Sequence, residues 1–505
     1  MPDTETTASD GPHADSAPSL GHPSGASRSE TAAMVVLALV VTTWIVIFGR
    51  LVVMKHFRLA SLDFDMGIHD QSVWLLAHFR GFLTVRGLQV FGHHATVGYL
   101  LYVPFSWLGA GVNFLNLSMV VVAALGAVPV FLLVRYRTGN AWIATTLGVV
   151  FLLHPALQFF MAELFHPEVM AITPLLCAYY CSVRRQWVWF SLWAVLAACW
   201  KEDVALAIVV LGLIVALRGD RRVGFITAAT ALTWFLAWTL GLFPLLDHGK
   251  VQSAGLYSDV GGSPSGMARM LFSHPSRFTA KIVTPEGRDY GWKLFAPFGF
   301  VALAAPLTLL IGIPQAFFDL VTNVPWTKTI TFHYAALPLV AVTIASVEGI
   351  SWIVRRITAP WGRALVVTVV AACAVLTTTA WGPSPIGDEY RHGVWALTAP
   401  ARLGSGHEAL HRVPAGAAVS ASYNLVAQLS ERAEIYSFPN PWETRNFGID
   451  GWPRRDPARV QWLVVDRAVL GPPDRALLDQ ILASGKFRVV YDRDDYVVAR
   501  RVRRG

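Results

Sequence analysis

Three aspartates, Asp63, Asp65 and Asp70, lie within eight residues of one another, just after the first apolar run of the sequence. A carboxylate at such a boundary can act as a general base that takes a proton from a hydroxyl group. Partial loss of water around it would raise its pKa towards a useful range. The alternative is a solvated loop in which Asp65 or Asp70 caps a helix. These residues alone leave both interpretations open.

Histidines and glutamates gather in two further motifs, His93-His94 and the stretch that holds Glu163, His166 and Glu168. Imidazole and carboxylate groups together can ligate a divalent metal. Their spacing matches no specific metal motif, and at a membrane boundary the same groups also bind headgroups, water or one another. We therefore expect these side chains, together with Asp70, to contact a substrate. No metal ligand is assigned, although a divalent metal remains an alternative.

Three consecutive ionisable residues, Lys201, Glu202 and Asp203, interrupt an otherwise apolar region. Such residues are costly in lipid and usually face a cavity or water, so they predict a functional site. Lys201 is a suitable partner for a phosphate; the alternative is a tight hairpin loop in water. The pair His333-Tyr334 could hydrogen-bond a phosphate or a sugar, although such a pair is also an ordinary interface anchor.

The elements that must position these residues are membrane helices. The chain is 54% hydrophobic and 15% charged, whereas a soluble domain carries about 25% charge. Six runs are long enough to span a bilayer, and six others are shorter or interrupted. The long runs are 32–53, 113–134, 139–158, 223–246, 334–354 and 361–381; the others are 95–108, 168–183, 187–200, 204–217, 294–305 and 306–322. This pattern predicts an all-α polytopic membrane bundle of about 11–12 spanning or half-length helices.

Three regions follow from the composition. Residues 1–30 predict a disordered tail, 31–385 a membrane domain with a long first outer loop at 55–94, and 386–505 a small α/β domain. In the last region, alternating apolar and polar residues predict strands, and one helical pattern lies between two of them. The strands are expected at 417–421, 434–438, 460–465, 487–491 and 496–498, and the helix at 474–483. Within the loop, 66–80 predicts a helix along the membrane surface, with Ile68, Val73 and Trp74 available to the interface.

Compact basic loops set the expected orientation in the cell membrane, because Lys and Arg favour the cytoplasmic side. The basic loops contain Arg135/Arg137, Arg184/Arg185, Arg218/Arg221/Arg222 and Arg355/Arg356. We therefore expect a cytoplasmic N-terminus, with all the motifs and the C-terminal domain outside. Orientation and anionic lipids also explain the net charge of +8, so no nucleic-acid partner is expected. Two features conflict with this topology. Arg50, Lys55 and Arg58 flank the end of the first helix that is expected outside. The stretch 95–134 resembles two segments, although the topology requires it to cross the membrane once.

With these motifs in order, the chain resembles the family of predicted membrane proteins called domain of unknown function 2079, over roughly residues 35 to 500. The matching stretches are Phe64-Asp65-Met66-Gly67-Ile68-His69-Asp70-Gln71, Gly92-His93-His94, Phe165-His166-Pro167-Glu168, Lys201-Glu202-Asp203 and His333-Tyr334. That family in turn resembles the GT-C class of membrane glycosyltransferases. The resemblance implies transfer, with inversion, of a sugar from a polyprenyl-phosphate donor to an extracytoplasmic acceptor that is a glycan, a protein or a lipid.

The same resemblance implies that the catalytic base is Asp63 or Asp65. Asp65 is favoured because it occupies the Asp-x-Gly position of the motif. The sequence lacks the Asp-Glu pair that some members of the class carry in this loop, which leaves the choice of base less certain. Lys201 and His333, with His93 or His94, would then compensate the charge of the departing phosphate.

Two other functions compete with this one. A membrane transporter or lipid flippase also uses intramembrane ionisable residues and short broken helices, but the chain shows no convincing internal repeat. A noncatalytic membrane scaffold that presents residues 386–505 would need no cavity joining Asp65, Glu168 and Lys201. The four cysteines lie in apolar runs and indicate neither disulfides nor a metal site.

Overall fold

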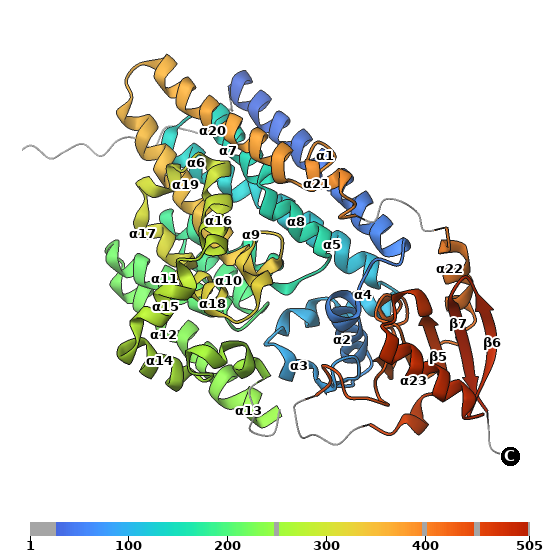
Figure 1. Ribbon diagram of the computed structural model, residues 1–505. Coiled ribbons are helices and arrows are strands. Elements are labelled where there is room, and N and C mark those ends of the chain that lie inside the picture. The colour runs from blue at the N-terminus through green and yellow to red at the C-terminus, as the bar shows by residue number, and fades with distance from the viewer. Residues whose placement is uncertain (1–26, 247–251, 396–400, 449–454, 503–505) are drawn as a thin grey trace, which may run out of the picture.

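The computed structural model describes residues 27–246, 252–395, 401–448 and 455–502. Helices make up a large body, and a small sheet domain lies at one end of it (Figure 1). Most of the predicted disordered tail, residues 1–30, lies outside the described residues. Its last three residues already belong to helix α1 (Arg28–Phe57), because the side chain of Ser27 accepts a hydrogen bond from the backbone N–H of Glu30 and caps the helix.

Within the described residues, five helical segments are long and apolar enough to cross a membrane, or six when a bent pair counts as one span. The five segments are α1, Val112–Thr138 (helices α5, Val112–Leu125, and α6, Ala127–Thr138), Arg221–Leu246, His333–Arg356 and Pro360–Trp381. The bent pair is α7 (Ala141–Leu153) and α8 (Pro155–Glu163), which meet at 44°. The bend falls at Pro155, whose missing N–H interrupts the helix. All six predicted long spans are present.

Shorter apolar helices complete the bundle. They are α9 (Pro167–Val183), α10 (Trp187–Ala198) and α11 (Val204–Leu217). The run 95–108 forms only η2 (Val97–Leu101) and α4 (Val103–Trp107), so 95–134 contains one span rather than two. The run 294–322 begins with short 3-10 turns and continues as a further short apolar helix, Pro306–Val321, which ends in α18 (Ile313–Val321). It packs tightly on α19 (Ala336–Arg356), where a Cβ at Gly349 would collide with the carbonyl of Val301.

The loop after α1 folds inward. It forms η1 (Asp63–Gly67), α2 (Ile68–Ala77), the short pair β1 (Phe82–Leu83) and β2 (Leu88–Gln89), and α3 (Val90–His93). The expectation that 66–80 lies along the membrane surface is wrong. Ile68 and Val73 are buried at 1% and 4% exposure, because α2 packs against α4 and η2 of the helical body, while the C-terminal domain packs against the preceding turn η1. A Cβ at Gly67 would stand only 2.9 Å from Val426 Cγ1 of that domain.

The C-terminal domain contains one five-stranded sheet in the order β4-β3-β5-β7-β6 (Figure 1). The strands are β3 (Val419–Ala421), β4 (Ile435–Ser437), β5 (Trp462–Asp466), β6 (Phe487–Arg493) and β7 (Tyr496–Arg501). Strand β3 pairs in parallel with β4 and β5, and β7 pairs antiparallel with β5 and β6. Helix α23 (Pro472–Ala483) connects β5 to β6. Each predicted strand and the predicted helix coincide with one of these elements.

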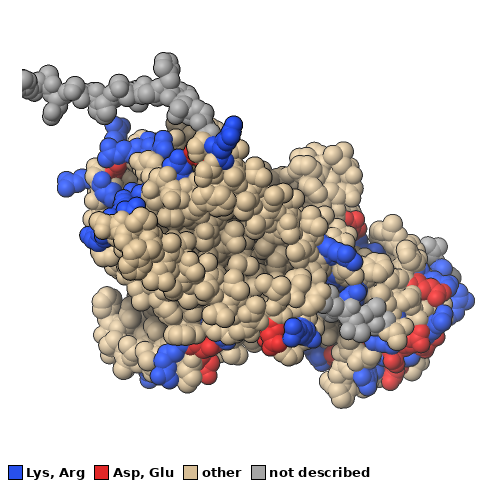
Figure 2. Space-filling model, turned by 90° about the horizontal axis from the view of Figure 1, so that it is seen from above, with Lys and Arg blue, Asp and Glu red and all other residues tan. Residues whose placement is uncertain are grey.

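Charged side chains are distributed unevenly over the surface. Figure 2 shows a broad uncharged face, with Lys and Arg gathered at one edge and both signs of charge over the C-terminal domain. Away from the sheet domain, Glu348 on α19 accepts hydrogen bonds from Arg137 on α6, at 2.6 Å, and from Tyr179 on α9, at 2.8 Å. Arg218 donates to the same tyrosine. These contacts tie together the helix ends that carry the basic loops.

Candidate functional site

The motifs meet in space although they are far apart in the chain. Asp65 Oδ1 lies 3.5 Å from His166 Nε2, and the ring of His166 stacks on that of His333 with 3.9 Å between centroids. We call the whole assembly the polar cluster. It consists of Asp65, His69, His93, His94, Glu163, His166, Glu168, Lys201, Glu202, Asp203 and His333. It lies where α8, α9, α11 and α19 begin or end, next to η1.

The turn between α8 and α9 positions three members of the cluster. Leu164 adopts φ 75°, which reverses the chain after Glu163, and the backbone N–H of Phe165 donates to the buried side chain of Asn116. Pro167 then begins α9. Glu163 accepts a hydrogen bond from the backbone N–H of His333 and lies 3.3 Å from Nδ1 of the same histidine. The end of α8 is therefore attached to the start of α19.

Lys201 is the cation at the other side of the cluster. Its ammonium group lies 2.5 Å from Glu168 Oε1 and 3.2 Å from Asp203 Oδ2, and all three side chains are largely buried. His333 Nε2 lies 3.6 Å from the same oxygen of Glu168. Glu168 thus links the lysine to the stacked histidines. Tyr334 also borders this region, with its ring centroid 6.0 Å from Lys201 Nζ.

The remaining members come from the loop after α1 and from the turn before α11. Glu202 accepts hydrogen bonds from the ring of His94, at 2.9 Å, and from the backbone N–H of Ala95, at 3.1 Å. His93 lies beside His94, with 4.4 Å between ring centroids. The motif Lys201-Glu202-Asp203 is therefore not a free hairpin loop, because its side chains hold other parts of the cluster.

The three aspartates of the first motif separate. The side chain of Asp65 is 35% exposed and faces the cluster, whereas the side chains of Asp63 and Asp70 are buried. Burial raises the pKa of Asp63 to about 6. Burial, and after it the charge of Glu431, raises the pKa of Asp70 to about 7. Neither Asp65 nor Asp70 caps η1 or α2, so the helix-cap alternative does not hold.

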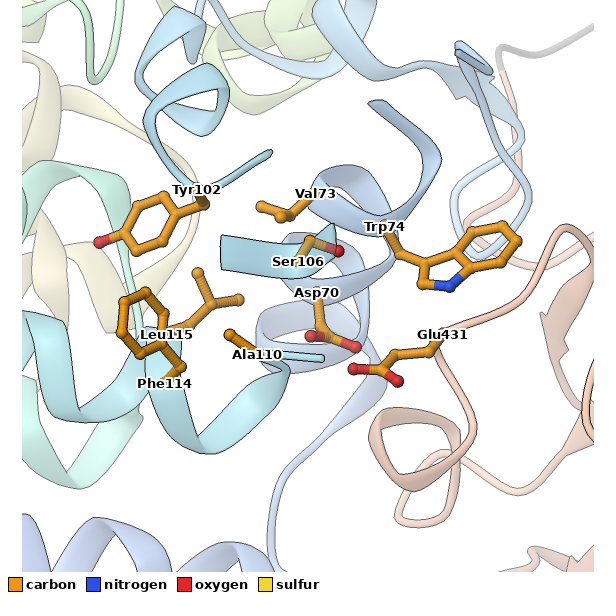
Figure 3. A pocket seen from close by; sticks show the side chains of 9 residues that line it. All are labelled: Asp70, Val73, Trp74, Tyr102, Ser106, Ala110, Phe114, Leu115 and Glu431. Atoms are coloured by element: carbon orange, nitrogen blue, oxygen red, sulfur yellow. The ribbon is translucent and has the colours of Figure 1, made fainter. Parts of the chain in front are cut away.

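Asp70 faces the C-terminal domain rather than the cluster. Its carboxylate accepts a hydrogen bond of 2.6 Å from the hydroxyl of Ser430. Figure 3 shows it beside Glu431 of the same domain. Asp70 also borders a cleft of about 660 Å³ between residues 108–114 and 427–432. The sequence analysis groups Asp70 with the cluster residues as substrate contacts, but the structure places Asp70 apart from them, against the C-terminal domain.

The contact between Asp65 and His166 favours a charged pair. Burial would raise the pKa of the Asp65 carboxyl, but contact with His166 and its charge outweigh burial and keep that pKa below its usual range. Burial would likewise lower the pKa of His166, yet the contact with Asp65 and the charges of Glu163, Asp65 and Glu168 together outweigh burial and raise that pKa to about 9. The other ring nitrogen, Nδ1, faces the carbonyl of Leu164 at 3.2 Å. Asp65 is the more exposed group of the pair, since its side chain is 35% exposed and that of His166 is 4% exposed.

Sequence reasoning missed three residues in or beside the cluster. His69 donates or accepts a 2.5 Å hydrogen bond with the Tyr99 hydroxyl, and its ring lies 5.4 Å from that of His166. Asp319, buried in α18, accepts from Gln315 and Tyr290. Its signal was an acid inside the apolar run 306–322, which the rule for intramembrane charges would have selected.

Lys55, the third missed residue, explains the conflict in the predicted topology. Its ammonium group donates to the carbonyls of Ala162, at 2.6 Å, and Val394, at 3.1 Å. The ammonium group also faces the charges of Glu163 and Asp65. This lysine therefore belongs to the protein interior beside the cluster and is not a loop charge that reports orientation.

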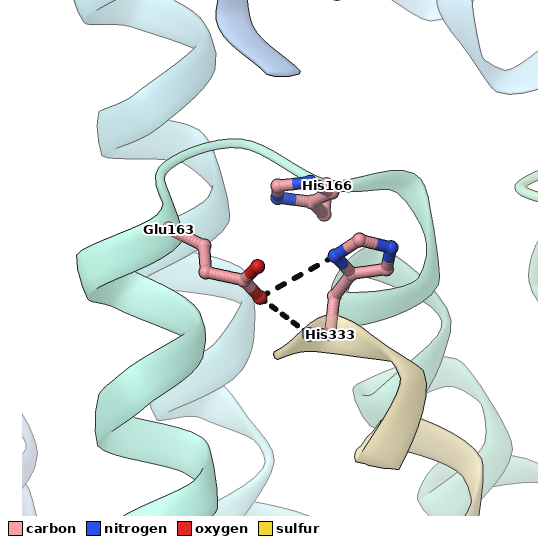
Figure 4. Close-up of side chains that lie close together, drawn as sticks. All are labelled: Glu163, His166 and His333. Atoms are coloured by element: carbon pink, nitrogen blue, oxygen red, sulfur yellow. Dashed lines mark hydrogen bonds and ion pairs between the residues drawn. The ribbon is translucent and has the colours of Figure 1, made fainter. Parts of the chain in front are cut away.

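Glu163, His166 and His333 could hold a metal, because each offers a ligand atom and the three atoms lie within 4.8 Å of one another (Figure 4). The two rings are nearly parallel, with 17° between their planes. Two imidazoles on one ion point their nitrogens at a common centre, whereas stacked rings point them along parallel lines. An ion would therefore require one ring to turn.

These features define a multi-pass membrane protein with a buried polar site at one end of its helices. The chain belongs to the family described as predicted membrane protein (DUF2079), whose model matches residues 55–498. No curated protein matches the sequence.

Among solved structures, the chain is similar to ArnT from Cupriavidus metallidurans. The form bound to undecaprenyl phosphate gives 15% identity, 91% of this chain and 98% of that chain covered, and a TM-score of 0.47. The apo form gives the same identity and coverage and a TM-score of 0.48.

Proposed function

We propose that this protein is an integral membrane glycosyltransferase that moves a sugar from a polyprenyl-phosphate donor to an extracytoplasmic acceptor, with Asp65 as the base. The observation that carries the proposal is the setting of Asp65. It is a partly exposed carboxylate, in contact with His166, in a cluster that also contains a buried lysine. A base and a cation in one site beside lipid suit displacement of a lipid phosphate by a hydroxyl.

The reaction is a single displacement. The acceptor oxygen attacks the anomeric carbon from the face opposite the lipid phosphate, and the new C–O bond forms as the bond between the anomeric carbon and the phosphate oxygen breaks. The acceptor proton moves to Asp65, and the bonding electron pair leaves with the polyprenyl phosphate. One displacement inverts the configuration at the anomeric carbon.

Of the two candidates for the base, the geometry favours Asp65 over Asp63. The carboxylate of Asp63 is 5% exposed and accepts a hydrogen bond from the backbone N–H of Phe64 at 2.8 Å. A buried carboxylate that holds a helix start has no path to an acceptor hydroxyl. Asp65 is open on the side of the cluster, and its partner His166 orients it.

The other predicted site residues receive supporting roles. Lys201 and His333 lie on either side of Glu168 and would face the departing phosphate, with His93 and His94 next to them. We place the cluster and the C-terminal domain outside the cell, because the basic loops lie at the other ends of the same helices. On this orientation the donor enters from the outer leaflet and the N-terminus is cytoplasmic.

Transport is the alternative that the broken segments would favour, since transporters place such segments at their sites. The distribution of charge weighs against it. Glu348 lies 15 positions after His333, or roughly 22 Å along the helical rise, and its network with Arg137 and Tyr179 ties the far ends of the helices together. A closed far end suits a site that works from one side.

The test is transfer by the full chain in nanodiscs, with a panel of polyprenyl-phosphate sugars and membrane extract as acceptor. Asp65→Asn should reduce the initial rate by about 10²- to 10⁴-fold, the usual contribution of a general base. Asp63→Asn is the matched control and should keep the rate within about threefold, a difference well below that range. Full transfer by the Asp65→Asn variant would refute the proposal.

A further inference from the structure

The polar cluster has too few fixed positive charges for an anionic substrate. Its five carboxylates are Asp65, Glu163, Glu168, Glu202 and Asp203. The cations that face them are Lys55, Lys201 and His166, the last in its charged pair with Asp65, so negative charge is in excess. The ammonium group of Lys201 is already paired with the carboxylates of Glu168 and Asp203. A phosphate that enters this cluster adds further negative charge to a partly buried acidic site, which is unfavourable unless a cation accompanies it.

We infer that Glu163, His166 and His333 bind one divalent transition-metal ion. The three side chains come from the end of α8, the turn before α9 and the start of the last buried span, so that the fold rather than one motif assembles them. His166 has a 4% exposed side chain, and those of Glu163 and His333 are 11% and 12% exposed. The metal site itself does not depend on the proposed function. Only the further ligand of the ion, a phosphate oxygen of the donor, rests on that function.

The present geometry is close to a site but not closed. On an ion with bonds of roughly 2.0–2.1 Å, two ligand atoms lie no more than about 4.2 Å apart, whereas these three lie within 4.8 Å of one another. His333 is the ring free to adjust. Its Nδ1 lies 3.3 Å from Glu163 Oε2, and that buried nitrogen makes no hydrogen bond to any described residue. The ion would turn this ring out of its stack on His166. It would also replace the proton through which one nitrogen of His166 contacts Asp65 or Leu164.

The ligand types select the ion. Two imidazole nitrogens with one carboxylate suit Zn²⁺, Mn²⁺, Co²⁺ or Fe²⁺, whereas Mg²⁺ and Ca²⁺ prefer oxygen ligands. Three protein ligands leave at least one position open, as in catalytic sites. A phosphate oxygen fits that position, and the ion would supply the positive charge that the cluster lacks.

The experiment measures metal binding by the full chain without any donor. Detergent-purified protein is stripped with a chelator and titrated with Co²⁺ in excess Mg²⁺, with visible absorption and elemental analysis as readouts. Wild type should bind about one ion per chain, and Glu163→Gln and His333→Gln should each weaken binding by at least about tenfold. His94→Gln is the matched control, a histidine of the same cluster outside the set, and should bind within about twofold of wild type.

The inference would be overturned if wild type showed no saturable binding. It would also be overturned if both ligand variants bound Co²⁺ as tightly as wild type does. Gel filtration and thermal unfolding check that each variant folds, and Glu163→Asp replaces Glu163→Gln if the latter does not. A chain that binds the ion but transfers no sugar contradicts only the proposed function. A chain that transfers sugar at full rate after chelation contradicts only the metal site.

Discussion

The carboxylate of Asp65 and the imidazole of His166 lie 3.5 Å apart, although one residue follows α1 and the other precedes α9. This contact joins the first loop to the middle of the membrane body. It also shows why neither motif is informative alone: each supplies one partner of a pair. The same holds for Lys201, whose acidic partner Glu168 is contributed by another helix.

Removal of the buried cation should destabilise the protein more than removal of the whole pair. Lys201→Met leaves Glu168 and Asp203 buried without their partner, and breaking a buried pair costs about 3–5 kcal/mol. The double variant Lys201→Met/Glu168→Gln also removes the uncompensated charge of Glu168. It should therefore recover part of the free energy of unfolding that the single variant loses. Thermal unfolding in one detergent gives both values. A double variant less stable than the single variant would contradict the assignment of a mutually compensating pair.

The buried carboxyl of Asp70 predicts a dependence of stability on pH. The folded-state pKa of Asp70, about 7, is above the usual value of 3.8, so the folded protein binds more protons than the unfolded chain between those values. Stability from this group is fully present below pH 3.8 and lost as the pH rises through 7. Asp70→Asn keeps an acceptor for Ser430 and should be more stable than wild type at pH 8. Melting curves at pH 5 and pH 8 should show a smaller pH effect in the variant; an unchanged effect would assign it elsewhere.

The network at the far end should matter for stability and not for chemistry. Glu348→Gln removes the charge that Arg137 and Tyr179 contact. The expected loss is about 1.5–3 kcal/mol, the range for hydrogen bonds to charged groups. Transfer per folded molecule should stay at the wild-type level, because the substitution lies far from Asp65. Rate assays normalised to folded protein measure this, and a selective loss of turnover would instead favour the transport alternative.

The proposed orientation can be measured by labelling. Leu108 is 83% exposed beside the cleft, and Arg185 lies in a basic loop with a 67% exposed side chain. In a variant without the four native cysteines, Leu108→Cys should react with an impermeant maleimide on intact cells. Arg185→Cys should react only after the cells are opened. The reverse pattern would move the polar cluster to the cytoplasmic side.

The spans and the sheet domain were predictable because their signals are local. Apolar length marks α1 and the last spans, and alternation marks β3 to β7. The convergence of His166, Lys201 and His333 has no local signal. It was expected only because the assignment of the basic loops to one side of the membrane places all the motifs on the other side. The burial of α2 was not predictable, since its apolar residues suit a membrane surface as well as a protein interior. The role of Lys55 was not predictable either, because its partners, Ala162 and Val394, are distant in the chain.

Helix α2 serves two parts of the molecule at once. His69 reaches the polar cluster, while Gln71, two residues later, donates to Thr84 and to the carbonyl of Arg432 in the sheet domain. A membrane portion expressed without residues after 385 would leave Gln71 without Arg432 and Asp70 without Ser430, in the helix that follows the turn of the proposed base. Exchange of the sheet domain alone, or of the first loop alone, for that of a relative would therefore break these contacts wherever the partner residue differs.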